Sequence, residues 1–245
     1  MFPKVEETSV PSVTTAQMIE VDRAMIEDYR ILLIQMMENA GRNLAHVARV
    51  RFFSDGLAGK RVAVLAGTGG NGGGALVCAR RLKNWGADVE VFVTKPDDEF
   101  AEIPGHQLRI VKRMDIATMV GTPSADAAFD LVVDGIIGYS LKGAPRGTAA
   151  DMIRWVAGQS AAVLALDAPS GVDTTSGSTF DPAIRATATM TLALPKEGLK
   201  MPSVRAHVGE LYLADISVPP ELYAEPALGL EVSPLFAQSD IVQLI

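Results

Sequence analysis

The chain has 245 residues, of which 48% are hydrophobic and 21% are charged, as in an ordinary soluble globular protein. Its net charge of −7 and its pI near 5.0 argue against binding to nucleic acid or to an anionic membrane surface, because both attract basic proteins. The single cysteine, Cys78, excludes an intrachain disulfide and fits a reducing compartment, the cytoplasm. We expect no signal peptide and no membrane span, since no segment has the required apolar pattern.

The first two predicted elements after the N-terminus are helices. Residues 1–13 are polar and contain two prolines, so we expect a loosely held lead-in. Thr14 and Gln17 then form a capping-box signature, which predicts the start of a helix with one apolar stripe. A second helix, over residues 32–51, is apolar on more than one side and should be deeply buried. Gly41 within it suggests a close approach to a neighbouring backbone.

Residues 61–82, RVAVLAGTGGNGGGALVCARRL, read as a strand, a glycine loop and a helix. Six glycines lie between Gly67 and Gly74, more than a tight turn alone needs. Such a loop directs backbone N–H groups and the positive end of a helix dipole at one point beyond the strand. An anionic ligand, most simply a phosphate, would bind there. Cys78 lies inside this helix and is interpreted as a packed apolar residue.

The same glycines fit a dinucleotide fingerprint, because Gly67, Gly69 and Gly72 match G-x-G-x-x-G after a predicted strand. The fingerprint also expects an acidic residue at the end of the next strand, where this chain has Thr94 and Lys95. An NAD-dependent oxidoreductase is therefore a disfavoured alternative.

The remaining elements alternate between strands and helices, which predicts a mostly parallel sheet covered on both faces. We expect further strands at residues 89–94, 108–112, 130–137, 162–166, 187–194 and 210–216. Helices are expected within residues 115–127 and 148–159, while residues 195–209 contain too many breakers for one. With a helix fragment and an irregular tail over residues 220–245, we predict about seven strands in a single domain, residues 1–245.

Unusual polar residues lie at three of the predicted strand ends. Asn71 lies in the glycine loop, Asp134 lies inside VVDGIIG, and Asp167 and Ser170 belong to LDAPSGVD. Ligands of open α/β sheets bind outside the carboxyl ends of the strands, so these side chains should converge. Their oxygens suit a hard cation. The alternative is that each aspartate caps the helix or turn that follows it.

Four segments resemble the NAD(P)H-hydrate epimerase family. They are TAQMIEVDRAMIEDYRI with MENAGR, GTGGNGGGALVCARRL, VVDGIIGYSLKGAPRG, and LDAPSGVDTTSG followed by ALPKEGL. The resemblance implies a Rossmann-like three-layer αβα sandwich. It also implies an isomerase that interconverts the two epimers of hydrated NADH and NADPH.

Carried over position by position, the resemblance implies which residues form the site. A potassium ion would be held by Asn71, Asp134 and Ser170. The hydrated nucleotide would be contacted by Gly70, Asn71, Gly72, Gly73, Gly74, Gly138, Tyr139, Ser140, Leu141, Lys142, Gly143, Ala144 and Asp167. Lys142 and Arg146 would meet phosphate charge or lie on a solvated turn. We hypothesise that Asp167 is the catalytic acid and base.

One loop departs from the family pattern. The family sequence N-N-G-G-D-G is here Gly70-Asn71-Gly72-Gly73-Gly74-Ala75, so an asparagine and an aspartate are replaced by glycine. This keeps open an alternative function, a non-catalytic nucleotide-binding or scaffold module of the same fold. Family members often carry a dehydratase kinase domain, which is absent here, so a separate kinase is the expected partner. A homodimer is a further candidate assembly.

Overall fold

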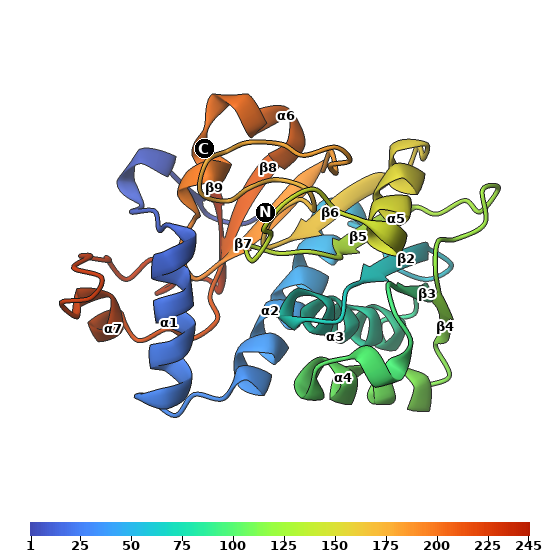
Figure 1. The fold of residues 1–245 in the computed structure, drawn as a ribbon, viewed down its shortest axis with the longest axis horizontal. Helices are drawn as coiled ribbons and strands as arrows, with labels where there is room; N and C mark the ends of the chain where they lie inside the picture. The colour runs from blue at the N-terminus through green and yellow to red at the C-terminus, as the bar shows by residue number, and fades with distance from the viewer.

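The computed structural model describes residues 1–245 and places nine strands in one sheet (Figure 1). The strands are β1 Lys4–Val5, β2 Arg61–Ala66, β3 Asp88–Val93, β4 Ala117–Val120, β5 Leu131–Gly135, β6 Ala162–Leu166, β7 Ala188–Leu192, β8 Glu210–Ala214 and β9 Ile241–Leu244. The helices are α1 Thr15–Glu27, α2 Leu33–Val47, α3 Gly70–Asn84, α4 Glu102–Arg113, α5 Gly147–Ala157, α6 Arg205–Val208 and α7 Pro220–Ala224. Short 3-10 turns and a π-helical turn after α2 complete the set.

The sheet order is β1-β9-β8-β7-β6-β5-β2-β3-β4, and every pair is parallel except β8 with β9. The chain adds β3 and β4 on one side of β2, then returns to add β5 on the other side. The strand order therefore reverses between β2 and β5, which is where such sheets bind ligands. At this point the Gly67 amide donates to the Gly135 carbonyl at 3.0 Å, so the two loops diverge from adjacent strands.

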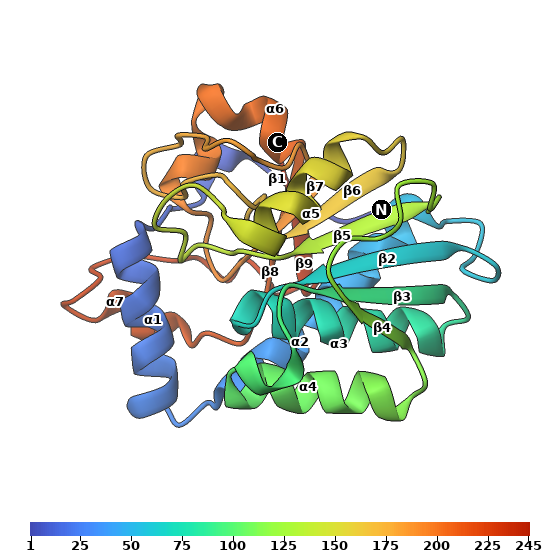
Figure 2. The ribbon, with the colours of Figure 1, turned by 45° about the vertical axis from the view of Figure 1, so that its right-hand side comes forward.

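Helices cover both faces of the sheet, as Figure 2 shows with α2, α3 and α4 on one face and α5 on the other. Alternate residues of β2 divide between the two layers. Val62 and Val64 belong to the core cluster that contains residues of α2, α3 and α4. Ala63 and Leu65 pack with residues of α5. This alternation is the period of two that a strand imposes, and it confirms the predicted α/β sandwich.

The helix starts at Thr14 as predicted. The Gln17 amide donates to Thr14 Oγ1 at 3.2 Å, and the Thr14 amide donates to Gln17 Oε1 at 2.9 Å, which completes the capping box. The second helix also lies close to its predicted range, because α2 continues through a π-helical turn to Phe52.

Two predictions in the middle of the chain are wrong, because a predicted strand is a helix and the predicted helix after it contains a strand. Residues 108–112, predicted as a strand, belong to α4. Pro104 sits in the first turn of α4, where its missing N–H costs no hydrogen bond, so it does not break the helix. The predicted helix over residues 115–127 is instead β4 and a loop. β4 pairs with β3 at the sheet edge, and this non-local pairing overrides the local pattern.

The helix fragment expected after residue 219 is α7, but the predictions for the lead-in, the last residues of the tail and one connection are wrong. The lead-in contributes β1, which pairs with β9 in the predicted irregular tail, so the sheet has nine strands rather than seven. Val10 and Val13 are buried, so the lead-in is held to the body of the protein. Between β7 and β8 the chain forms one short helix, α6, where none was expected.

Candidate active site

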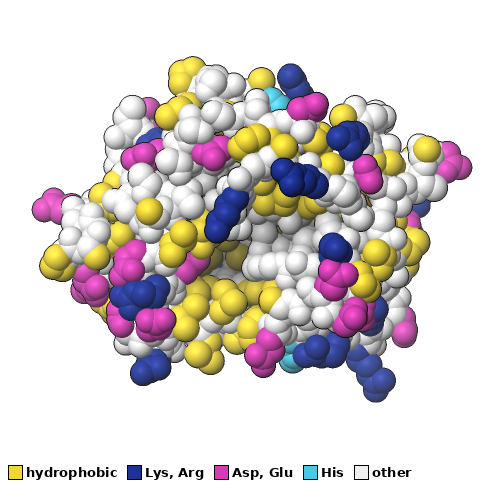
Figure 3. All heavy atoms as spheres, in the orientation of Figure 1, with side chains coloured by type: hydrophobic (Ala, Val, Ile, Leu, Met, Phe, Trp, Pro, Cys, Tyr) yellow, Lys and Arg dark blue, Asp and Glu magenta, His cyan; other side chains and the backbone are white.

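A cavity of about 280 Å³ opens at the reversal of strand order. Figure 3 shows it as a hollow in the centre of this face, with hydrophobic side chains gathered along its lower side. Nine of its 16 lining residues are hydrophobic. Its charged lining residues are Asp22, Asp167 and Lys196. An apolar cavity with a few convergent polar groups is the usual form of a small-molecule site.

The structure brings part of the predicted site together around this cavity. Six of the predicted residues line it, namely Gly70, Asn71, Gly138, Tyr139, Ser140 and Asp167. Others do not line it: the first turn of α3 at Gly72, Gly73 and Gly74, the outer loop at Leu141, Lys142, Gly143 and Ala144, and the buried pair Asp134 and Ser170. Lys142 and Arg146 are exposed on the loop between β5 and α5.

Asp167 follows β6 in a left-handed backbone conformation, with φ of 65°. An aspartate tolerates this conformation better than most residues, but it remains uncommon and often marks a functional position. The Tyr139 amide donates to Asp167 Oδ2 at 3.2 Å. The carboxylate is only 3% exposed and points into the cavity lining, where it needs a charged partner.

That partner is Lys196, which is fully buried and forms an ion pair with Asp167 Oδ1. The Lys196 ammonium also donates to the Leu192 carbonyl at 3.0 Å and to Thr191 Oγ1 at 3.3 Å. These three acceptors satisfy all three of its N–H groups. The pair is thus a fixed arrangement of one proton donor and one proton acceptor beside the cavity.

The N-terminal lead-in contacts the backbone around Lys196. Val13 is buried, and its backbone forms an isolated parallel β-bridge with Lys196. The Val13 amide donates to the Pro195 carbonyl at 2.9 Å, and the Glu197 amide donates to the Val13 carbonyl at 3.0 Å. These bonds fix the backbone on both sides of Lys196.

Lys196 and Asp22 are the site residues that sequence reasoning missed. Lys196 comes four residues after the end of β7, at the same sheet edge as Asp167. That position was the available signal, because a lysine just after a buried strand must find a partner there. Asp22 lies in α1, whereas the predicted site residues lie at the ends of strands. Nothing in the sequence therefore indicated that Asp22 lines the cavity.

Asp134 and Ser170 form a second buried group beneath the loops. The Ser170 amide donates to Asp134 Oδ2 at 2.8 Å, and the Ser170 hydroxyl donates to Asp134 Oδ1 at 2.6 Å. Both residues have no exposed surface. Burial raises the pKa of Asp134 to about 6, and the Ser170 hydrogen bonds oppose that rise. The carboxylate accepts these bonds from neutral groups and not from a cation.

The oxygens near Asp134 fit a monovalent cation. Asn71 Nδ2 is a buried donor without a hydrogen-bond partner, which only an acceptor would satisfy, so a cation would contact the amide oxygen Oδ1 instead. A Cβ added at Gly138 would lie 3.2 Å from Asn71 Oδ1, so the loop after β5 closes over this amide. Because no three His, Cys, Asp or Glu side chains cluster anywhere in the chain, the group offers one negative charge and neutral oxygens.

The altered loop residue Gly74 lies next to the cavity floor. A Cβ added there would lie 2.8 Å from Leu166 Cδ2 and 3.8 Å from Ala40 Cβ. Leu166 and Ala40 both line the cavity. A side chain at this position would therefore reach the floor, which in this chain is apolar. The change leaves the Asp167–Lys196 pair in place.

Comparison with known proteins identifies the family. Residues 33–198 match the family described as YjeF-related protein N-terminus. The chain belongs to this family. The family resemblance expected from the sequence is thereby confirmed. None of the helices combines the length and the apolar character of a bilayer-spanning segment.

Relatives in the YjeF-related family cover nearly the whole chain. This chain is 39% identical over 236 residues to the NAD(P)H-hydrate epimerase of Dehalogenimonas lykanthroporepellens. The alignment covers 96% of this chain and 94% of the relative. The chain is 37% identical over 220 residues to the bifunctional NAD(P)H-hydrate repair enzyme Nnr of Moorella thermoacetica. That match covers 86% of this chain but only 41% of the longer relative.

A solved structure has the same fold. The crystal structure of yeast ynu0 superposes with a TM-score of 0.80, covering 96% of this chain and 100% of the yeast chain. At 24% identity this likeness shows the fold. This chain and the yeast protein therefore share the α/β architecture described above.

Proposed function

We propose that this protein epimerises the hydrated forms of NADH and NADPH. The observation that carries the proposal is the buried Asp167–Lys196 pair at the wall of an otherwise largely apolar cavity. Relatives that align over most of this chain and are named NAD(P)H-hydrate epimerase support the same reaction.

The chemistry requires two proton transfers and one open cavity. The hydrated ring carries a hydroxyl on the carbon next to the ring nitrogen. The nitrogen lone pair expels this hydroxyl as water once a proton is supplied, which leaves an iminium cation. Water then adds to the opposite face and loses a proton to a base. An acid and a base within reach of the ring are sufficient.

The Asp167–Lys196 pair supplies a donor and an acceptor at one point. The Lys196 ammonium is a proton donor and the Asp167 carboxylate an acceptor, and the carboxylate also stabilises a neighbouring iminium cation. Burial strengthens both effects because few water molecules screen the charges. Replacing Asp167 with asparagine should slow epimerisation by about a hundredfold to ten-thousandfold. A variant as fast as the wild type would remove this role.

The nucleotide would lie along the loops after β2 and β5. The first turn of α3 begins at Gly70 and presents free backbone N–H groups, which suit a phosphate. The loop from Gly138 to Ala144 would border the same ligand, and the exposed Lys142 and Arg146 carry charge that a phosphate could meet.

We propose that potassium is the cofactor, held by Asn71, Asp134 and Ser170. The Asn71 amide oxygen, which lies next to Gly138, and the Asp134 carboxylate, which has no cationic partner, support this donor set. The ion would neutralise buried negative charge and fix the two loops that border the nucleotide. Proton transfer remains with the chain's own residues.

The alternative is a nucleotide-binding or scaffold module without turnover. The replacement of the family's loop aspartate by Gly74 motivates it. The retained pair of Asp167 and Lys196 favours the enzyme, because a buried ion pair is costly to maintain and this one lines the cavity. Binding of hydrated NADPH without interconversion of its epimers would favour the module.

A coupled assay tests the proposed function. The epimer that a dehydratase kinase rejects is incubated with this protein, that kinase and its nucleotide, with and without potassium. We expect recovery of NADH or NADPH, measured by absorbance, only when this protein is present. Relatives named bifunctional repair enzymes motivate the pairing with a kinase, which we propose is a separate cytoplasmic protein. We propose a homodimer as one candidate assembly, and the molar mass of the same purified protein in solution would test it.

A further inference from the structure

The cavity has two walls of different origin. One wall comes from helices α1 and α2 and includes Met18, Asp22, Met36 and Ala40. The other wall comes from residues that follow the sheet strands and includes Asp167 and Lys196. Asp22 is the charged residue of the helical wall. Each wall therefore presents one carboxyl group to the same space.

Tyr139 connects the two carboxyl groups. Its hydroxyl donates to Asp22 Oδ2, and its backbone amide donates to Asp167 Oδ2 at 3.2 Å. Lys196 Nζ lies 5.9 Å from the centroid of its ring. The tyrosine lines the cavity between the two groups. Asp22 and the Tyr139 hydroxyl thus form one proton-carrying unit on the helical wall.

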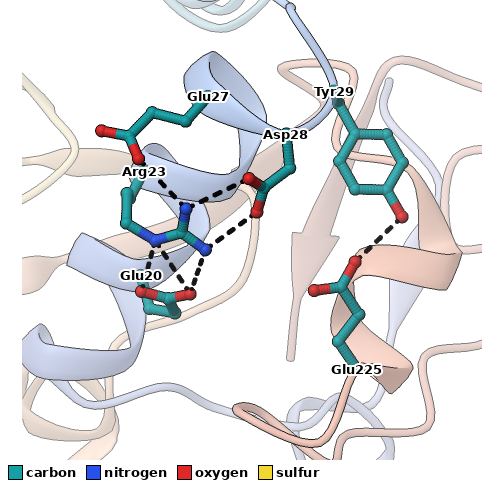
Figure 4. Close-up of polar contacts among 6 residues, drawn as sticks. All are labelled: Glu20, Arg23, Glu27, Asp28, Tyr29 and Glu225. Atoms are coloured by element: carbon teal, nitrogen blue, oxygen red, sulfur yellow. Dashed lines mark hydrogen bonds and ion pairs between the residues drawn. The ribbon is translucent and has the colours of Figure 1, made fainter.

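Asp22 has no cationic partner of its own. The adjacent Arg23 pairs with Glu20, Glu27 and Asp28 on the outside of α1 (Figure 4). Burial raises the pKa of Asp22, and the Asp167 charge adds to that rise, while the Tyr139 hydrogen bond and the Lys196 charge oppose it. Tyr223 of α7 is the remaining titratable group that senses Asp22. Asp22 therefore retains a proton more readily than an exposed aspartate.

Epimerisation inverts the carbon, so oxygen leaves from one face of the ring and returns to the other. A ring bound between the two walls would expose one face to each. We propose that Asp22, together with the Tyr139 hydroxyl, is the second proton-transfer group of the site and serves the face opposite to the Asp167–Lys196 pair. This inference rests on the proposed function.

Each proton transferred during the inversion has a donor or an acceptor in the site. On the helical face, the unit of Asp22 and Tyr139 gives a proton to the hydroxyl as the carbon–oxygen bond breaks and the ring nitrogen forms its double bond to carbon. On the other face, water bonds to that carbon, the iminium electrons return to nitrogen, and the Asp167–Lys196 pair takes the proton. Exchange with solvent restores both groups, and the reverse direction exchanges their roles.

Oxygen-18 water distinguishes this arrangement from a single group that serves both faces. Wild-type protein, Asp22→Asn and Tyr139→Phe are each given the two pure epimers of hydrated NADPH, in separate reactions in oxygen-18 water. Chromatography measures inversion, and mass spectrometry measures label in the unchanged epimer. Asp28→Asn is the matched control, because Asp28 lies at the end of the same helix and pairs only with Arg23 outside the cavity.

We expect Asp22→Asn to slow inversion of both epimers by at least about a hundredfold, while label still enters one of them, the epimer whose hydroxyl faces the Asp167–Lys196 pair, within a few-fold of the wild-type rate. The Asp167–Lys196 pair alone would release and return water on one face. Tyr139→Phe should show the same separation, which keeps the test decisive if Asp22→Asn does not fold. Unchanged inversion, or an equal fall in inversion and labelling for both epimers, would overturn the inference. Wild-type protein that neither inverts nor labels the substrate would instead refute the proposed function.

Discussion

At the scale of single residues, Asp167 and Lys196 depend on each other. Both side chains lie almost entirely out of water, with exposed fractions of 4% and 0%. Removing one partner leaves an uncompensated charge in the interior, which is more costly than removing both. The pair therefore contributes to stability as well as to the proposed chemistry.

We predict that Lys196→Met lowers the free energy of unfolding by about 3–5 kcal/mol. The cause is the unpaired Asp167 carboxylate, because methionine fills a similar volume. The double variant Asp167→Asn with Lys196→Met should recover part of this loss, since no charge remains. Urea unfolding followed by circular dichroism measures both. Equal losses in the single and double variants would show that the charge is not the cause.

At the scale of elements, the site depends on how closely α2 and α3 approach. A Cβ at Gly41 of α2 would lie 2.4 Å from the Gly74 carbonyl and 2.4 Å from Val77 Cβ. The sequence predicted a close approach at Gly41, and the structure confirms it. This contact sets the position of the glycine loop at the start of α3.

We predict that Gly41→Ala destabilises the protein by about 1 kcal/mol or more, although alanine is the better helix former by about that amount. Backbone atoms of α3 cannot move aside as a flexible side chain can. Gly158→Ala is the control, because its Cβ would meet only the Trp155 carbonyl, at 3.5 Å. Thermal unfolding compares the two. A Gly41→Ala protein as stable as the control would mean that the helices separate freely.

Elements defined by local pattern were predictable, and elements defined by distant partners were not. The buried strands β2, β5 and β6 and the capped start of α1 follow from apolar runs and a capping box. β1, β4 and β9 are short strands near the sheet edges, and their pairing partners determine them more than their own sequences do.

At the scale of the whole molecule, the site is where separate parts of the chain meet. Asn71, Asp134 and Asp167 were predictable because each lies at or after the carboxyl end of an apolar strand, and parallel strands end at one sheet edge. Asp22 and Lys196 complete the cavity from α1 and from the segment after β7. The place of Asp22 depends on how α1 packs, which no local pattern reveals, whereas Lys196 follows β7 and is fixed by the bridge from Val13.

We predict that potassium stabilises the wild-type protein through Asp134. An ion that binds only the folded state at a hundred times its Kd adds about 2.7 kcal/mol. Exchanging potassium for a bulky organic cation at equal ionic strength should lower the Tm of the wild type but not of Asp134→Asn. Asp126→Asn, an exposed aspartate of the loop before β5, should behave as the wild type. An equal Tm in both salts would argue against the ion.

The most direct test of the account is the interconversion of the two epimers themselves. Purified protein is mixed with one pure epimer of hydrated NADPH, and chromatography follows the appearance of the other, beside Asp167→Asn and a sample without protein. We predict rapid approach to the epimer equilibrium with the wild type and a rate at least about a hundredfold lower with Asp167→Asn. A wild-type rate equal to that of the sample without protein would contradict it.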